Sequence, residues 1–317
     1  MKKLIKNKSM WAGMVVGALI AVPTFWVGAS FSEDEQEAHA QNEEKPPVTA
    51  ELKDKKKIKI ISDFTKDMEK TTGLFSIYTN PKKGEYYLEL TQDQLNERFI
   101  LSSQIENGVA ASGLMKGVYA GTRIVYFEKK FNKLRLISEN TDYTFDKESA
   151  LSRASHANIT DAIISAEDIL AKNEENTRFL IKVNKLFISE ALTRLKSPKS
   201  PKSPKDSFSL GTVNDKKSTV VSLKNFATNL SIRSELAFDN HNISARSSAG
   251  ITDARFVNIT IQHDFITMPD DNFKPRKPDA RVGFFAVERI NSTEMVKMPW
   301  DDMIFRWRLE KKYPNKT

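Results

Sequence analysis

Alternation of apolar and polar residues with a period of two is the feature that most constrains this chain. In residues 230–238, leucine, isoleucine and phenylalanine recur at alternate positions, and residues 303–309 repeat the pattern with methionine, phenylalanine, tryptophan and leucine. This spacing puts successive side chains on opposite faces of an extended strand, with one face buried and the other in water. Such half-buried strands are typical of antiparallel sheets.

Two pairs of these runs are separated by turn-forming or polar residues. Residues 75–77 lead through Asn80–Gly84 into residues 86–90, and residues 124–127 and 134–137 flank a polar, lysine-rich tip. Apolar alternation on both sides of a short polar segment predicts a β-hairpin. We therefore expect one hairpin at each place.

Helical signals are sparse. Asp63–Lys70 and Ser165–Lys172 are predicted to form short helices, and Gln92–Glu97 a turn. Parallel βαβ architecture is disfavoured because its long crossover helices are missing. The predicted fold class is mainly β, or α+β with few short helices, in which antiparallel hairpins form one large or two smaller β-sandwich or barrel-like units.

The N-terminus is typical of an export signal. A lysine-rich start precedes the apolar run Met10–Val27, and cleavage is predicted after Ala29, with Ala40 as a second candidate. Residues 1–29 are thus interpreted as a signal peptide. The alternative is an uncleaved anchor, in which residues 10–27 span the inner membrane. Both interpretations predict export, to the periplasm or outside the cell.

Composition divides the rest of the chain. Residues 30–57 are acidic and then lysine-rich, with few apolar residues, and are predicted to be a disordered spacer. Three Ser-Pro-Lys repeats in residues 197–206 predict a solvated linker or loop. This segment separates a β-rich N-terminal half, 58–196, from a β-rich C-terminal half, 207–317. The halves are either two β domains or one domain with a long inserted loop.

Residue content excludes several chemistries. The chain has no cysteine, and its four histidines include no His-Glu-x-x-His pair, so neither a disulfide nor the usual zinc-hydrolase helix is present. His263 lies on the apolar side of a predicted strand and is interpreted as a hydrogen-bonded core residue. Without residues 1–29, 45 basic residues face 41 acidic ones. This small excess argues against nucleic-acid binding, and membrane contact is expected only through an uncleaved N-terminus.

Carboxylate pairs are the remaining candidates for acid-base chemistry. Neighbouring acids on a strand or turn face different directions, so a solvated surface is the favoured interpretation over a glycosidase-like dyad. The pairs are Glu89 with Asp93, Glu167 with Asp168, Asp270 with Asp271, and Asp301 with Asp302.

Four stretches in order carry a family resemblance. They are Gly73–Tyr78 with Tyr86–Leu90, Gly121–Phe127, Met268–Phe285 and Phe305–Lys312. Together they resemble the region of unknown function that precedes the catalytic domain in large bacterial zinc-dependent, metzincin-like metalloproteases. The resemblance spans residues 58–313. It implies that zinc and the catalytic residues belong to a domain that follows this region, so no catalytic residue, metal ligand or cofactor is assigned here.

The resemblance leads to two hypotheses about function. The first is a non-catalytic accessory module of an exported zinc metalloprotease, truncated or split from its peptidase domain and inactive alone; its partner would be that domain or a protease fragment encoded downstream. The alternative is a free-standing periplasmic or secreted protein that binds a peptide or protein. The candidate partner-facing residues are Arg276, Lys277, Arg281, Arg306 and Arg308. A solvated surface is the competing interpretation for these cations.

Overall fold

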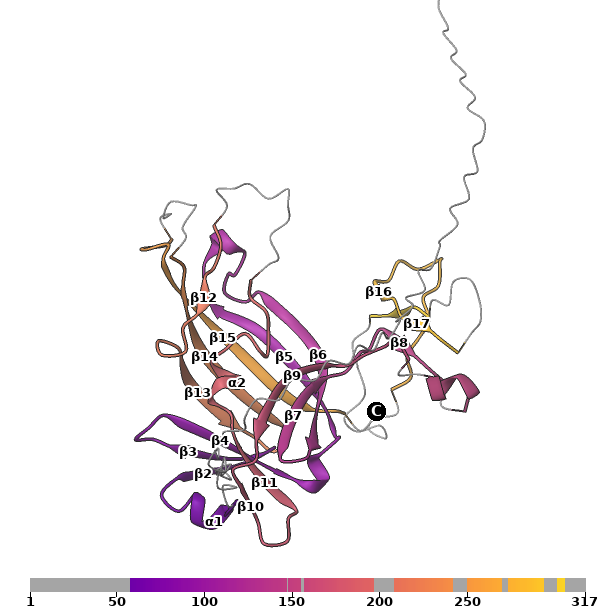
Figure 1. Ribbon diagram of the computed structural model, residues 1–317. Helices are drawn as coiled ribbons and strands as arrows, with labels where there is room; N and C mark the ends of the chain where they lie inside the picture. The colour runs from indigo at the N-terminus through magenta and orange to yellow at the C-terminus, as the bar shows by residue number, and fades with distance from the viewer. Residues whose placement is uncertain are drawn as a thin grey trace, which may run out of the picture. The chain divides into compact units, whose positions relative to one another are not determined.

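A computed structural model describes residues 58–146, 148–154, 157–196, 208–241, 250–269, 273–293 and 301–305 (Figure 1). All of them belong to one compact unit, residues 56–317. The predictions for residues 1–29, 30–57 and 197–206 lie outside the described residues. The fold is mostly β, with antiparallel sheets, a curled half-barrel and two short α-helices in the described part, which confirms the predicted fold class.

The larger sheet has eight strands and curls into the half-barrel (Figure 1). Its order is β12-β14-β15-β5-β6-β7-β9, with β13 also paired to β14, and every pairing is antiparallel. The strands are β5 (Arg98–Asn107), β6 (Tyr119–Lys130), β7 (Lys133–Ser138), β9 (Ala162–Asp168), β12 (Thr212–Val213), β13 (Thr219–Asn225), β14 (Asn229–Asp239) and β15 (Phe256–Thr267).

The smaller sheet has six strands in the order β1-β10-β11-β4-β3-β2. Only the β1–β10 pair in this sheet is parallel. The strands are β1 (Lys59–Ile60), β2 (Glu69–Thr72), β3 (Ser76–Asn80), β4 (Glu85–Thr91), β10 (Ala171–Lys172) and β11 (Arg178–Lys182).

Both predicted hairpins are confirmed. Strands β3 and β4 pair from Ser76 with Glu89 to Asn80 with Glu85, and Gly84 takes a positive φ of 62° in the turn. Strands β6 and β7 pair as far as Lys130 with Lys133. Period-two burial in β14 also follows the sequence pattern, because its alternate leucine, isoleucine and phenylalanine residues are buried.

Strands on both sides of residues 197–206 lie next to each other in the larger sheet. β15 pairs with β5, with His263 opposite Ser103. The same hydrophobic core contains Leu101 from one half of the chain and Ile232 and Phe265 from the other. The two halves therefore share one sheet and one core.

Phe75 packs the smaller sheet onto the larger one. Its ring meets the rings of Phe99, Phe127 and Phe265 edge to face, with centroid separations of 5.2, 5.9 and 6.3 Å. Edge-to-face contacts add to the stability that burial of these large side chains provides. The core of the unit is thus continuous across the two sheets.

One segment covers the inner face of the larger sheet. Helix α2 (Asn184–Phe187) and residues 188–196 follow β11. Leu192 joins the core cluster that contains Phe75, whereas Leu195 joins a second cluster that contains Ile105 and Ile259. We call residues 184–196 the covering segment.

Two predicted helices are wrong. Ser165–Lys172 instead forms parts of β9 and β10. In the 63–70 segment only Asp63 and Phe64 are helical, as the end of α1 (Ile61–Phe64), and β2 begins at Glu69. Pairing of β9 with β7 and of β2 with β3 supplies the backbone hydrogen bonds there. Helices this short lack stability of their own, so sheet pairing overrides the weak local preference. The predicted turn at Gln92–Glu97 is confirmed as a short 3-10 helix, η1 (Gln92–Gln94).

The remaining described elements are short. Two further 3-10 helices are η2 (Ala110–Ser112) and η3 (Ala150–Ala154). Two small pairings join β8 (Tyr143–Thr144) to β17 (Ile290–Asn291), and β16 (Ala286–Val287) to β18 (Met303–Ile304). Of the strand predicted over residues 303–309, only Met303 and Ile304 form a described strand, β18, while Phe305 is outside it and 64% exposed, so the predicted burial of its side chain is wrong. Positions from 306 on lie outside the described residues. No helix in the described ranges is long and apolar enough to cross a membrane.

Candidate binding site

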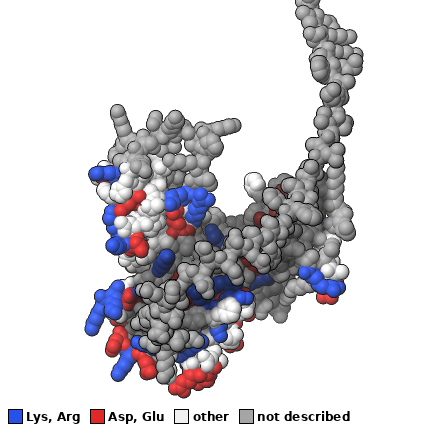
Figure 2. All heavy atoms as spheres, viewed as in Figure 1, with Lys and Arg blue, Asp and Glu red and all other residues white. Residues whose placement is uncertain are grey.

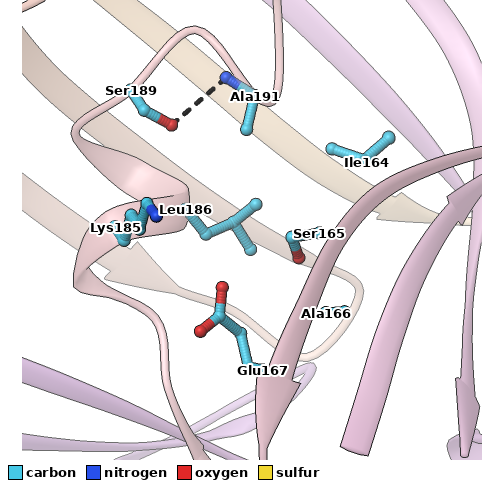
Figure 3. Close-up of a pocket in the computed structure, with 8 residues that line it drawn as sticks. All are labelled: Ile164, Ser165, Ala166, Glu167, Lys185, Leu186, Ser189 and Ala191. Atoms are coloured by element: carbon cyan, nitrogen blue, oxygen red, sulfur yellow. Dashed lines mark hydrogen bonds between the residues drawn. The ribbon is translucent and has the colours of Figure 1, made fainter. Parts of the chain in front are cut away.

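A pocket of about 220 Å³ lies between β9 and the covering segment (Figure 3). Strand β9 forms one wall and α2 with the residues after it forms the other. The lining residues are Ile164, Ser165, Ala166, Glu167, Lys185, Leu186, Ser189 and Ala191. The pocket therefore combines an apolar floor with one acidic group, one basic group and two hydroxyl groups.

Glu167 directs its carboxylate into this pocket (Figure 3). It pairs in register with the buried Leu134 of β7, which puts its side chain on the same face as the core. Burial raises the pKa of Glu167, and the neighbouring charge of Asp168 adds to this, while Lys185 and Lys133 oppose it. In the described part of the chain the Glu167 carboxylate has no hydrogen bond or ion pair.

The side chains of the opposite wall are buried, hydrogen-bonded or exposed to solvent. Leu186 is buried in the core, and the Oγ of Ser189 accepts a hydrogen bond of 3.2 Å from the backbone N–H of Ala191. Lys185 is exposed to solvent. Among the described pocket groups, the Glu167 carboxylate and the Ser165 hydroxyl are partly buried and form no hydrogen bond, and Glu167 is the charged one of the two.

Strand β9 is an edge of the larger sheet. It pairs with β7 on one side, and within the described ranges no backbone group of residues 162–168 is bonded on the other side. A register shift between Leu136 and Ile137 makes Ile164 an extra residue, a β-bulge. Ile163 leaves 57% of its surface exposed at this edge. Unpaired edge groups are a template for another strand.

The prediction that neighbouring acids face different ways is confirmed for Glu167 and Asp168. Glu167 is half-buried in the pocket, whereas Asp168 is exposed and its Oδ1 lies 2.9 Å from the Nζ of Lys133. The pocket itself was not predicted, because Ser165–Lys172 was interpreted as a helix. The adjacent β-branched residues Ile163 and Ile164 are the signal that favours a strand here.

Glu89 and Asp93 are also separated by the fold. Glu89 is buried and accepts a hydrogen bond of 2.8 Å from the hydroxyl of Tyr78, with Arg178 at 3.5 Å, whereas Asp93 is exposed. These two acids do not form a dyad. Asp270 and Asp271 lie outside the described residues.

The predicted partner-facing cations lie near β16 and β18. Arg276, Lys277 and Arg281 are exposed. Lys277 forms an ion pair with Asp301 at 2.9 Å, and Arg281 forms one with Asp279 at 2.6 Å, which lowers the pKa of Asp279 to about 2. Local pairing reduces the charge that two of these cations present to a partner. Arg306 and Arg308 lie outside the described residues.

Exposed apolar side chains occur in the same segments of the chain as these cations. Phe285 is 89% exposed, Phe305 is 64% exposed, and the backbone N–H of Phe305 donates to the carbonyl of Phe285 at 2.8 Å. Val282, Phe284 and Val287 are exposed as well. We call these five residues the aromatic patch. Large apolar side chains gathered at one exposed place are typical of an interaction surface.

Charges elsewhere are mixed. Over the described part of the face in Figure 2, Lys and Arg side chains alternate with Asp and Glu side chains, and neither sign forms an extended patch. Ten ion pairs are found among the described residues, and in most of them the cation is exposed while the carboxylate is partly buried. Recognition at this face would therefore depend on local groups.

His263 is a core residue, as predicted. It is 1% exposed, and its Nδ1 lies 2.8 Å from the Oγ of Ser103. Thr193 of the covering segment donates to the same Oγ at 2.6 Å. Burial lowers the pKa of His263 to about 3, and the Arg123 cation contributes in the same direction. A neutral, hydrogen-bonded imidazole here links β5, β15 and the covering segment.

Possible metal ligands are dispersed. In the ranges that the structure describes, no three His, Asp or Glu side chains come close enough together to hold a metal ion. His241 lies beside Phe256, and its ring meets that residue's ring edge to face at 6.4 Å. His39 and His156 lie outside these ranges.

Comparison with known proteins identifies the family. The model named "Domain of unknown function (DUF5117)" matches residues 117–312, which is more than half of the chain, and the chain belongs to this family. No curated protein and no solved structure matches the chain. The matched range contains β9, the covering segment and the aromatic patch.

Proposed function

We propose that this chain is a non-catalytic accessory module of an exported zinc-dependent metalloprotease and that it holds a protein or peptide partner for a peptidase domain. The ordered resemblance over residues 58–313 supports the proposal, and the DUF5117 match covers residues 117–312 of the same region without naming a function. The structural observation that carries it is the aromatic patch, because exposed aromatic groups at one place gain most from being covered by a second protein surface.

Association with a peptidase domain tests this proposal. The domain of a full-length relative that carries the His-Glu-x-x-His helix should bind the purified chain in sedimentation or calorimetry. Phe285→Ser should weaken this binding by at least about tenfold, since buried aromatic anchors dominate interface energetics. Phe131→Ser is the matched control, because Phe131 is also 89% exposed but lies in the β6–β7 turn. Equal losses in both variants, or none, would contradict the proposed surface.

Peptidase activity tests the non-catalytic part. The purified chain should leave casein intact with and without added zinc. A mixture of the chain with the peptidase domain should hydrolyse casein. Zinc-dependent hydrolysis of casein by the chain alone would contradict this part of the proposal. Contaminating protease is controlled by repeating the assay after a second, orthogonal purification step.

A free-standing exported binding protein is the second candidate, and the pocket beside β9 favours it. An edge strand with a pocket at its side can hold a peptide without a peptidase domain. Translation of the DNA that follows codon 317 separates the candidates. A frame that encodes a His-Glu-x-x-His helix favours the accessory module, and unrelated sequence favours the free-standing protein.

A further inference from the structure

We infer that β9 binds an extended peptide as an added strand, with one basic side chain of the peptide inserted beside Glu167. The inference rests on the proposed role in holding a partner, and it names the chemistry of that partner. It involves a different surface from the aromatic patch. Three observations support it: the free edge of β9, the size of the pocket and the state of the Glu167 carboxylate.

The backbone of β9 provides the first contact. Six of its seven residues pair with β7 on one side, with Ile164 as the bulge, and the outward N–H and C=O groups are unpaired in the described structure. A peptide that adds to such an edge gains main-chain hydrogen bonds whatever its sequence. The exposed Ile163 gives an apolar contact to a side chain of the added strand.

The pocket provides one side-chain position. Its volume of about 220 Å³ is below the ~300–1,000 Å³ of pockets that enclose drug-sized ligands. It is bordered by Ile164–Glu167 of β9 itself, so it opens beside the edge at which a peptide would pair (Figure 3). A strand directs alternate side chains to the same face, and one of them would enter here.

The charge of the pocket selects the side chain. A partly buried carboxylate without a hydrogen bond is unfavourable, and a cation beside it removes that cost. Lys185 is the competing group on the opposite wall, and its charge lowers the pKa of Glu167, but it is exposed and forms no ion pair with Glu167 within the described ranges. A lysine or arginine side chain of the peptide therefore complements the pocket better than an acidic or apolar one.

Fluorescence anisotropy with a defined peptide tests the inference. The probe is a labelled hexapeptide of alternating threonine and valine with one central lysine, and its analogues carry norleucine or glutamate at that position. The lysine peptide should bind the full chain at least about tenfold more tightly than either analogue, as expected for a charge-assisted hydrogen bond. Equal affinity for the lysine and norleucine peptides, or no binding of the lysine peptide at millimolar concentration, would overturn the inference.

Two variants locate the selectivity. Glu167→Gln keeps the shape of the side chain and removes its charge, and it should abolish the preference for lysine over norleucine. Asp168→Asn is the matched control, since it removes the neighbouring charge on the opposite face, and it should leave the preference unchanged. Retention of the preference in Glu167→Gln would contradict the assignment. Thermal unfolding of both variants checks that they are folded.

Backbone methylation tests the strand pairing. Two versions of the lysine peptide carry N-methyl groups on opposite sets of alternate residues. Methyl groups on the N–H groups that point to β9 should abolish binding, and methyl groups on the other N–H groups should not. The reason is that an added strand directs only alternate N–H groups to the sheet edge. Hydrogen exchange in residues 162–168 should slow by more than about tenfold on binding, and exchange in residues 219–225 should not. Equal binding of both methylated peptides would exclude strand addition.

The β9 site and the accessory role can fail separately in these experiments. Loss of peptide binding with normal association of the peptidase domain would reject only the β9 site. The reverse result, peptide binding without association, would reject the accessory module and favour the free-standing binding protein.

Discussion

The covering segment contributes to two polar regions, and they differ in whether their polar groups are hydrogen-bonded. Toward the core, Thr193 joins Ser103 and His263 in a buried hydrogen-bonded cluster. Toward β9, Lys185, Leu186, Ser189 and Ala191 form the wall of a pocket in which the Glu167 carboxylate has no hydrogen bond or ion pair among the described residues. Buried polar groups that are mutually hydrogen-bonded specify a structure, whereas a partly buried group without a partner is available to a ligand.

Acid should affect the two regions in opposite ways, and the larger effect is expected from His263. Its folded-state pKa of about 3 lies below its ordinary value of 6.5, so the unfolded chain binds more protons between these values. The contribution of His263 to the free energy of unfolding is therefore fully present above about pH 6.5. It decreases as the pH falls toward 3, by up to roughly 5 kcal/mol. Urea unfolding followed from pH 7 to pH 4 measures the slope.

A substitution attributes that slope to His263. His263→Leu should flatten the dependence on pH between 6.5 and 4, because leucine does not bind a proton. It also leaves the hydroxyl of Ser103 with one partner fewer, which should cost about 1–3 kcal/mol at pH 7. An unchanged slope in this variant would show that other groups govern acid unfolding. His241→Leu is the matched control, since His241 lies beside Phe256 away from this cluster.

Removal of the Thr193 hydroxyl should have an intermediate effect. Thr193→Val keeps the shape of the side chain and removes the hydrogen bond to Ser103, so we expect about 1–3 kcal/mol lower stability in urea unfolding. Thr260→Val is the control on β15, where a threonine of similar burial should tolerate the change within about 0.5 kcal/mol. Equal losses in the two variants would contradict a special role for the Thr193 hydroxyl.

The smallest expected effect is a gain in stability when the charge of Glu167 is removed from the pocket. The pKa of Glu167 is raised in the fold, so its contribution to stability is present at low pH and decreases as the pH rises through that pKa. Glu167→Gln should therefore stabilise the chain at pH 7, by at most about 1 kcal/mol after solvent screening. Thermal unfolding at pH 7 and pH 4 measures it. A loss of stability at pH 7 would show that the carboxylate has a structural partner.

Sequence reasoning succeeded where the pattern is local. The alternation in β14, the two hairpins and the buried position of His263 were all predicted, because period-two spacing decides which side chains face the core. It failed for Ser165–Lys172, where pairing with β7 overrides a weak helical preference. The pocket was missed for the same reason, since it exists only when β9 is a strand.

By itself, the sequence determined that this chain forms antiparallel strands with one apolar face and that it carries the signature of the DUF5117 family. Tertiary structure alone decided which strands are neighbours. Ser103 and His263 are 160 residues apart and meet because β5 pairs with β15, and Glu167 faces Leu186 because the covering segment returns past the edge of β9. Such contacts depend on long-range pairing, and no local spacing encodes them.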